Sequence, residues 1–399
     1  MALYLFALSM ARRWGRARQA LSSNDYDILL TGTFYSENWL LPHLQPLAGA
    51  EACRRVRMVA TSPVPAIPKV EAIYPPLWLC KLVGNVPARL MMFTWLALKD
   101  RPQVVGGFHL LLNGLFAILL ARLVGARSLY ICGGGERELV GGGYMTENRI
   151  FKRIGKSDTI IERQLLSAVR CCDLNIVMGS KTKNFFVEQG VSSAIHIIPG
   201  GFDELRFQPI QVAPEADLIT LGRLSKVKRI DLLLEAISLL RMSRPSISTV
   251  IVGDGPEKTA LEQKAKALCL EDQVHFAGHQ DSVEQWLCKA KVFVLCSDSE
   301  GVSQAMIQAM LCGLPVVVSH VGDLADVVVD GVNGFLVADR TPVNFAERIE
   351  LLLKNPKRWA TMSYAARKTA EQYGMAISSQ KWDVILTGRP RKRIETKCN

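Results

Sequence analysis

The sequence lacks the features that mark several large classes of protein. It has no zinc-ligand spacing, no aromatic RNA-binding strand and no leucine heptad run, which argues against a nucleic-acid-binding protein. No short internal repeat is visible, which argues against a solenoid or a propeller. Charged residues make up 21% of the chain and hydrophobic residues 49%, a balance that excludes a disordered or fibrous protein. The sequence therefore predicts a folded globular protein.

Uninterrupted hydrophobic runs are also scarce. The segment closest to a membrane span, residues 108–126, is interrupted by His109, Asn113 and Arg122, so we interpret it as a buried helix. The first ten residues are apolar, but arginines follow rather than precede them and no small-residue cleavage site is present. They do not form a good signal peptide. This start of the chain either docks on the fold or lies in a lipid headgroup region.

Cysteine is present without a pattern. The ten cysteines contain no C-x-x-C pair and no regular spacing of a disulfide framework. Several follow apolar runs, as Cys296 does, where a reduced cysteine behaves as a small hydrophobic residue. The sequence therefore predicts a reducing, cytoplasmic location.

Acidic residues are in deficit, and only in the first half of the chain. The net charge is +11; residues 1–200 hold 23 Lys and Arg against 13 Asp and Glu, whereas residues 201–399 hold 25 against 24. A basic half indicates an anionic partner. Because nucleic-acid signatures are missing, we predict an anionic membrane surface as that partner.

The chain is long enough, at 399 residues, for two domains of ordinary size. In its second half, apolar runs that predict strands alternate with segments that predict helices, which is typical of a doubly wound α/β domain. The expected strands there are 218–221, 249–252, 274–276, 292–295 and 316–319, and the expected helices are 229–242, 258–268, 283–290 and 304–312. The first half repeats the pattern less regularly, with strands at 27–30, 57–60, 103–105, 129–132, 174–178 and 195–198. We predict two Rossmann-like domains facing a cleft, with the polar segment 208–217 as the linker.

Polar loops follow four consecutive strands of the second half, at 222–228, 253–256, 278–281 and 298–304. Ligands of open parallel sheets bind at that edge. Arg223 and Lys228 suit a diphosphate, although two such cations also occur on ordinary solvated surfaces. Glu300 comes shortly before a helix whose free N–H groups favour phosphate; alternatively it is a turn or capping residue.

Several motifs, in this order, resemble the retaining glycosyltransferases of family 4, which have the GT-B fold. The close match covers residues 218–337, and a looser one, Ile-Pro-Gly-Gly-Phe-Asp, covers residues 198–203. The motifs are Gly222-Arg223-Leu224 with Lys228, Val-Gly-Asp-Gly-Pro-Glu at 252–257, the Glu300 loop, Cys-Gly-Leu-Pro-Val at 312–316 and Asp-Gly-Val-Asn-Gly-Phe at 330–335.

The resemblance implies transfer of a sugar from a UDP- or GDP-sugar with retention of anomeric configuration, without a metal ion or other cofactor. The donor is expected on the second domain, residues 208–375. The first domain, residues 1–207, is expected to bind a glycan or lipid-linked acceptor of cell-surface polysaccharide or lipopolysaccharide biosynthesis. Residues 376–399 are expected to cross back onto the first domain, and their basic end to help attachment to the inner face of the cytoplasmic membrane.

The resemblance also implies roles for individual residues. Arg223 and Lys228 would neutralise the diphosphate leaving group, because charge accumulates there as the glycosidic bond breaks. Glu300 would hold sugar hydroxyls. The other donor-binding residues that it implies are Gly32, Gly222, Gly253, Gly255, Gly278, His279, Gly301, Val302, Ser303 and Gln308.

The sequence departs from the family pattern in its polar residues. Gln308 stands where the family has a second glutamate for the ribose hydroxyls, and Gly133 where it often has a histidine near the donor sugar. His109 either approaches the cleft as a catalytic group or caps a helix. The glycine-rich segment 133–143 is either a mobile acceptor loop or an ordinary connection. These departures leave an inactive binding or scaffold protein, or an epimerase of the same fold, as alternatives.

Overall fold

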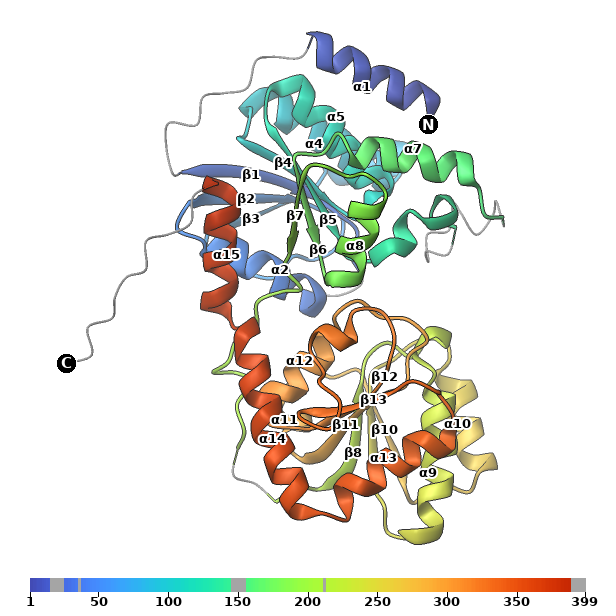
Figure 1. Ribbon diagram of the computed structural model, residues 1–399. Coiled ribbons are helices and arrows are strands. Elements are labelled where there is room, and N and C mark those ends of the chain that lie inside the picture. Colours follow the sequence, from blue (N-terminus) through green and yellow to red (C-terminus); the bar gives the residue numbers. More distant parts are fainter. Residues whose placement is uncertain (15–24, 35–36, 145–155, 211–212, 389–399) are drawn as a thin grey trace, which may run out of the picture. The chain divides into compact units, whose positions relative to one another are not determined.

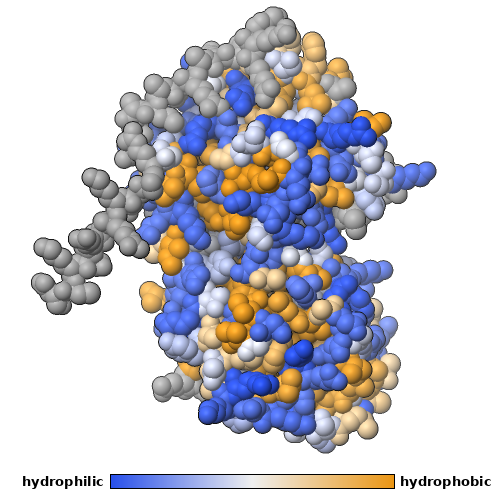
Figure 2. Space-filling model, viewed as in Figure 1, coloured by the Kyte–Doolittle hydropathy of each residue, from blue (hydrophilic) through white to orange (hydrophobic). Residues whose placement is uncertain are grey.

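The computed structural model describes residues 1–14, 25–34, 37–144, 156–210 and 213–388. The chain forms two compact units (Figure 1). Unit 1 comprises Met1–Gly201 together with Met375–Asn399, and unit 2 comprises Phe202–Gly374. Apolar residues reach the surface of both units on the face drawn in Figure 2, between hydrophilic ones.

Unit 1 is built on a seven-stranded sheet of order β3-β2-β1-β4-β5-β6-β7, in which every neighbouring pair is parallel. Its strands are β1 (Tyr26–Thr31), β2 (Cys53–Val59), β3 (Val70–Ile73), β4 (Val104–Phe108), β5 (Arg127–Cys132), β6 (Leu174–Val177) and β7 (Ala194–Ile197). Its helices are α1 (Ala2–Trp14), α2 (Glu37–Gly49), α3 (Leu77–Val83), α4 (Asn85–Asp100), α5 (Leu115–Val124), α7 (Thr159–Val169), α8 (Ser180–Glu188) and α15 (Met375–Thr387).

Alternation along β1 divides the apolar side chains between the two faces of this sheet. Ile28 and Leu30 belong to the core under α2 and α15, which lie side by side (Figure 1). Leu29 belongs to the core on which α4 and α5 pack. Because both faces are covered, the central strands are mostly apolar, as expected for a parallel sheet.

The predicted buried helix over residues 108–126 is wrong in its first part. Strand β4 runs to Phe108, an irregular turn follows at Leu110–Gly114, and helix α5 begins only at Leu115. The turn is held by buried Asn113, whose Nδ2 donates to the carbonyl of Phe108 at 2.8 Å. A Cβ on Gly107 would lie 2.6 Å from the backbone of Asn113, so the glycine permits this turn. No helix in the described residues is both long and apolar enough to cross a bilayer.

Unit 2 is built on a six-stranded parallel sheet of order β10-β9-β8-β11-β12-β13. Its strands are β8 (Ala216–Leu221), β9 (Thr249–Val252), β10 (Val274–Gly278), β11 (Ala290–Leu295), β12 (Val316–Ser319) and β13 (Gly334–Val337). Its helices are α9 (Ile230–Ser243), α10 (Lys258–Ala267), α11 (Val283–Leu287), α12 (Gln304–Leu311), α13 (Pro342–Leu353) and α14 (Pro356–Ala370). The sequence analysis did not predict β3, β13, α13, α14 or most helices of unit 1, and α11 ends earlier than predicted because β11 already begins at Ala290.

The boundary between the units lies at Gly201–Phe202, earlier than the predicted linker at 208–217. Phe202 is buried in the core of unit 2, and its N–H donates to the carbonyl of Tyr373 at 3.0 Å. Strand β8 already begins at Ala216, within the predicted linker. Helix α15 belongs to unit 1, where Trp382 is buried. The basic tail at 389–399 lies outside the described residues.

Candidate functional site

Two loops of unit 2 leave neighbouring strands at the point where the strand order reverses. Residues 222–229 follow β8, residues 296–303 follow β11, and β8 and β11 are paired in the sheet. The N–H of Asp298 donates to the carbonyl of Val227 at 2.8 Å, so the two loops are joined. Ligands of doubly wound sheets bind at such a reversal point.

Lys228 and Glu300 meet between these loops. The Lys228 Nζ lies 2.7 Å from Glu300 Oε1, and Ser297 Oγ donates to the same oxygen at 2.5 Å. The two side chains are only 22% and 12% exposed. Their ammonium and carboxylate groups are therefore fixed by short, partly shielded contacts, which are stronger than those of a solvated surface pair.

A second charged cluster supports the Glu300 loop. Asp298 Oδ1 accepts from Arg340 Nη1 at 2.5 Å and from Arg229 Nη1 at 3.3 Å, and Arg229 also binds Asp231 at the start of α9. These contacts tie the loop to α9 and to the segment after β13. Sequence analysis did not single out these residues, because their pairing depends on the strand order.

Glycines bring the loop backbones into close contact. A Cβ on Gly253 would lie 1.9 Å from the carbonyl oxygen of Gly222, and a Cβ on Gly322 would lie 1.7 Å from that of Glu300. Gly253 and Gly322 also have φ of 141° and 58°, which favour glycine. The N–H of Gly253 in turn donates to the carbonyl of Gly278 at 2.7 Å. The loops after β8, β9 and β10 therefore form one continuous edge. Gly322 was missed by the sequence analysis.

The other predicted residues of unit 2 lie on or near this edge. Arg223 is exposed on the loop after β8, where Gly222 is half-buried, and Gly255 approaches the backbone of Leu224. His279 is exposed after β10, with its Nε2 3.5 Å from Asp281. Gly301 and Val302 precede α12, and Ser303 caps it, accepting from the N–H of Met306 at 3.4 Å. Gln308 is half-buried farther along α12.

His109 and Gly32 lie in unit 1, after β4 and β1. His109 does not cap a helix, since its side chain makes no capping bond. Its Nδ1 instead lies 2.8 Å from Glu138 Oε1, and its ring stacks on Trp39 with centroids 5.5 Å apart. A Cβ on Gly133 would lie 3.0 Å from His109 Cε1, so the imidazole lies directly against this glycine.

Glu138 organises the glycine-rich segment 133–143. Its buried carboxylate accepts from the N–H of Leu110 at 2.7 Å, the hydroxyl of Tyr130 at 2.7 Å and the N–H of Gly134 at 2.6 Å. The segment folds into two short 3-10 turns, Gly135–Glu138 and Val140–Gly142. The sequence analysis did not single out Glu138; its one signal was an acidic residue between two glycine triplets.

His109 and Glu138 each favour the charged form of the other. Burial lowers the pKa of His109, but the adjacent Glu138 carboxylate outweighs it, so the pKa is raised above its ordinary value. Burial raises the pKa of Glu138, but His109 and the hydrogen-bond donors outweigh it, so that pKa is lowered. Burial, with a smaller effect of His109, lowers the pKa of neighbouring His43 to about 3, which keeps that imidazole neutral.

The carbonyl oxygen of Gly32 accepts a hydrogen bond from a buried arginine. Buried Arg89 donates from Nη1 to the Gly32 oxygen at 2.8 Å and to Thr31 Oγ1 at 2.7 Å, and from Nη2 to Asn113 Oδ1 at 2.8 Å. Burial lowers the pKa of Arg89 to about 10, so the guanidinium stays charged at neutral pH. A Cβ on Gly32 would lie 2.9 Å from that of Phe108, so close packing accounts for this glycine.

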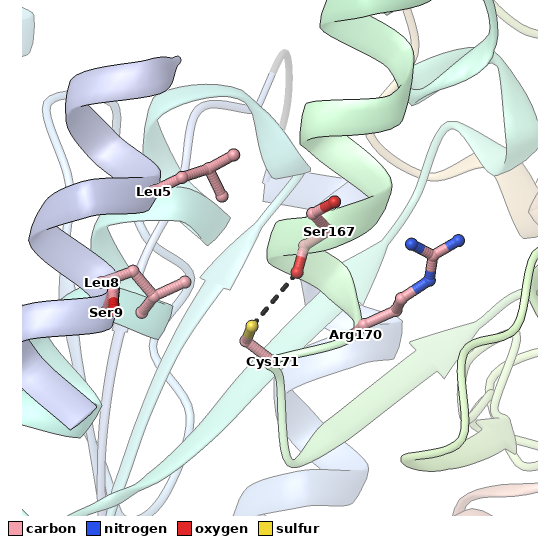
Figure 3. A pocket seen from close by; sticks show the side chains of 6 residues that line it. All are labelled: Leu5, Leu8, Ser9, Ser167, Arg170 and Cys171. Carbon is pink, nitrogen blue, oxygen red and sulfur yellow. Dashed lines mark hydrogen bonds between the residues drawn. The ribbon is translucent and has the colours of Figure 1, made fainter. Parts of the chain in front are cut away.

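A cavity of about 330 Å³ lies elsewhere in unit 1, between α1 and the end of α7 (Figure 3). It is lined by Leu5, Leu8, Ser9, Ser167, Arg170 and Cys171, and the Cys171 thiol donates to the carbonyl of Ser167 at 3.1 Å. It contains none of the predicted site residues. Across the ranges that the structure describes, no group of three or more His, Cys, Asp or Glu side chains is placed to hold a metal ion.

Known proteins resemble both the sequence and the fold. An uncharacterized glycosyltransferase of Haemophilus influenzae is 27% identical over 60% of this chain and 66% of its own length. N-acetyl-alpha-D-glucosaminyl L-malate synthase of Bacillus anthracis is 33% identical over 40% of this chain and 42% of its own. The matches thus span less than two thirds of each relative.

The structure of Anabaena HepE in complex with UDP-glucose superimposes with a TM-score of 0.69, at 19% identity, covering 91% of this chain and all of that one. At that identity the likeness shows the fold alone. Two Rossmann-like domains with parallel sheets make this the GT-B fold. Residues 201–369 match the model of the family described as glycosyl transferases group 1.

Proposed function

We propose that the protein is a hexosyltransferase-type enzyme that transfers a sugar from a nucleotide-diphosphate donor, with retention of anomeric configuration. The observation that carries this proposal is the Lys228–Glu300 pair at the reversal point of the unit 2 sheet. A cation and an anion side by side match the two ends of the expected ligand, since its diphosphate attracts an ammonium group and its sugar hydroxyls donate to a carboxylate.

In the proposed reaction, the bond between the anomeric carbon and the donor's phosphate oxygen breaks, and the acceptor oxygen bonds to that carbon. The acceptor proton passes to the departing diphosphate. Arg223 and Lys228 stabilise the negative charge that builds up on the leaving group. Donor binding requires the Lys228 ammonium to exchange part of its contact with Glu300 for phosphate.

The donor is proposed to be a UDP- or GDP-sugar, and the complex of HepE with UDP-glucose supports the uridine nucleotide. Gln308 replaces the family's second glutamate. An amide still accepts a hydrogen bond from a ribose hydroxyl, but the bond is weaker by about 1 kcal/mol than one to a carboxylate. No metal ion or other cofactor is part of the proposal.

His109 is proposed as a further catalytic group, with Glu138 as its positioning residue. Glu138 binds Nδ1, so Nε2 is the ring nitrogen available to a ligand. The imidazole lies against Gly133, where the family often has a histidine. We propose that His109 takes over that histidine's contact with the donor sugar.

The acceptor is proposed to be a glycan or lipid-linked saccharide of cell-surface polysaccharide or lipopolysaccharide biosynthesis. The protein would work in the cytoplasm at the inner face of the membrane. The nine cysteines within the described ranges form no disulfide, and the basic surplus lies in residues 1–200; both support this location.

The test is incubation of the purified protein with single nucleotide sugars, with free nucleoside diphosphate and the anomeric configuration of the released sugar followed by NMR. A retaining transferase releases diphosphate slowly to water and keeps the configuration. Conversion of the donor into another nucleotide sugar without release would indicate an epimerase. Binding without any reaction, including after addition of saccharide acceptors, would favour a binding or scaffold protein.

A further inference from the structure

Helix α3 is apolar and has no buried residue. Its sequence is Leu-Trp-Leu-Cys-Lys-Leu-Val, and the side chains of Leu77, Trp78 and Leu82 are 79%, 66% and 74% exposed. A helix of seven residues does not hold its shape through its own hydrogen bonds alone. An exposed helix of this composition in water loses the hydrophobic contribution that burial would give, so a partner is expected to cover it.

Helix α4 continues this exposed surface. It is apolar on two faces. On the inner face, Phe93, Leu96 and Ala97 are buried in unit 1. On the outer face, Met91, Trp95 and Leu98 are 53%, 53% and 54% exposed. Their spacing of four and three residues places them on one side of the helix. A surface helix normally carries polar residues there, so the outer face of α4 is also unpartnered.

The α3–α4 surface is defined here as Leu77, Trp78, Leu82, Met91, Trp95 and Leu98. The two helices adjoin at Gly84, which caps α3 by donating to the carbonyl of Cys80 at 2.9 Å and accepts from the N–H of Ala88. Nine of the 25 exposed large hydrophobic residues in the described ranges fall between Tyr74 and Leu98. They are concentrated on two helices that contact each other, unlike the scattered apolar residues that any protein surface has.

The charged side chains within the segment that carries this surface are all positive. No Asp or Glu occurs between Tyr74 and Lys99. Lys81 is exposed on α3, and Lys99 extends over the Trp95 ring, with its Nζ 4.5 Å from the ring centroid. Tryptophan, leucine and lysine together on short helices are typical of segments that lie in the headgroup region of a bilayer.

We propose that the α3–α4 surface is where the protein docks on an anionic lipid bilayer, with Trp78 and Leu82 inserted among the headgroups. A second copy of the chain fits less well, because two-fold pairing of this surface would bring like charges together. The inference rests on the proposed membrane location, but not on the donor site in unit 2.

The experiment is flotation of the full chain with vesicles of phosphatidylglycerol and phosphatidylcholine, and with phosphatidylcholine alone. The variant Trp78→Glu/Leu82→Glu is compared with Met242→Glu/Tyr364→Glu, which changes two exposed residues of unit 2 (82% and 67% exposed) by the same charge. Wild type and control should float with the anionic vesicles, and the α3 variant should partition at least about tenfold less.

Two further measurements keep the outcomes distinct. Brominated lipids should quench wild-type tryptophan fluorescence, and Trp78→Phe/Trp95→Phe, which keeps the apolar surface, should still float but lose most of the quenching. Equal flotation of the α3 variant and the control, or no flotation of wild type, would overturn the inference. A wild-type dimer that the α3 variant dissociates would overturn it in favour of a second copy. Binding of nucleotide sugar is measured separately in each variant, so the donor site and the docking surface can fail independently.

Discussion

Glu300 accepts a hydrogen bond from Lys228 at 2.7 Å, although the two residues stand 72 positions apart in the chain. The contact exists because β8 and β11 are neighbouring parallel strands, so the loops that follow them lie side by side at one edge of the sheet. It brings together the lysine that the motifs predict to bind the donor's diphosphate and the glutamate that they predict to bind the donor's sugar.

Replacing Lys228 or Glu300 by alanine should abolish transfer and leave the protein folded. Loss of one preorganised group that stabilises developing charge lowers kcat by about 10²-fold or more. The measurement is release of nucleoside diphosphate, with circular dichroism as the check on folding. Lys226→Ala, an exposed lysine on the same loop, is the matched control and should keep its activity. Full turnover by either variant would contradict the assigned roles.

Gly322→Ala should disturb the Glu300 loop. A Cβ there would lie 1.7 Å from the Glu300 carbonyl oxygen, whereas Gly331, also at positive φ, has nothing within 4 Å of its Cβ position. Both alanine variants place a Cβ on a residue with positive φ, which strains the backbone. Only Gly322→Ala also brings that Cβ into a steric clash. Gly322→Ala should therefore lower the free energy of unfolding by about 2 kcal/mol more than Gly331→Ala, and weaken donor binding. Equal urea midpoints for the two variants would show that the loop moves aside freely.

Glu138→Gln should make the stability of unit 1 depend differently on pH. The raised pKa of His109 contributes stability that is present below its ordinary value of 6.5 and lost as the pH rises through the folded value. The lowered pKa of Glu138 contributes stability that is present above 4.5 and lost as the pH falls through the folded value. The pair therefore contributes most between these ordinary values.

Urea unfolding of Glu138→Gln should show a larger loss relative to wild type at pH 6 than at pH 8.5. An NMR titration of the imidazoles should show the pKa of His109 falling once the carboxylate is gone, since burial then prevails. The groups that face His109 are Glu138, Trp39 and neutral His43. Glu136→Gln, on the same turn, is the control and should leave this titration unchanged. A pH-independent loss in Glu138→Gln would mean that the pair is not charged.

Gln308→Glu should strengthen nucleotide binding. A carboxylate accepts a ribose hydroxyl more strongly than an amide does, by about 1 kcal/mol, or roughly fivefold in Kd. Calorimetry with UDP and with its 2′,3′-dideoxy analogue separates this effect from a general change. The gain should be confined to UDP; weaker binding of UDP would indicate that α12 does not face the ribose.

The sequence predicted the unit 2 edge well, because a parallel sheet places every strand's carboxyl end on the same side. That rule located Gly222, Gly253 and Glu300 without the structure. Gly322 and Asp298 were missed, since their contacts depend on which loops become neighbours. His109 and Glu138 stand 29 positions apart, after the neighbouring strands β4 and β5, and no periodic pattern predicts their contact.

The sequence analysis also did not predict that helices α3 and α4 expose apolar residues. Apolar residues on all sides of a helix ordinarily indicate burial, and the sequence does not show that the outer residues Trp95 and Leu98 face away from the core. The predicted helix over residues 108–126 failed for a related reason: hydrophobicity was continuous, but the backbone between Phe108 and Leu115 is shaped by Gly107 and Asn113.

The most direct test of the proposed function is thermal unfolding of wild type and Lys228→Ala with a panel of UDP- and GDP-sugars. A ligand at 100 times its Kd stabilises the folded state by about 2.7 kcal/mol, enough to raise the midpoint by several degrees. One nucleotide sugar should protect wild type, and Lys228→Ala should lose most of that protection. Protection by none of them, or equal protection of both proteins, would contradict a donor site at Lys228 and Glu300.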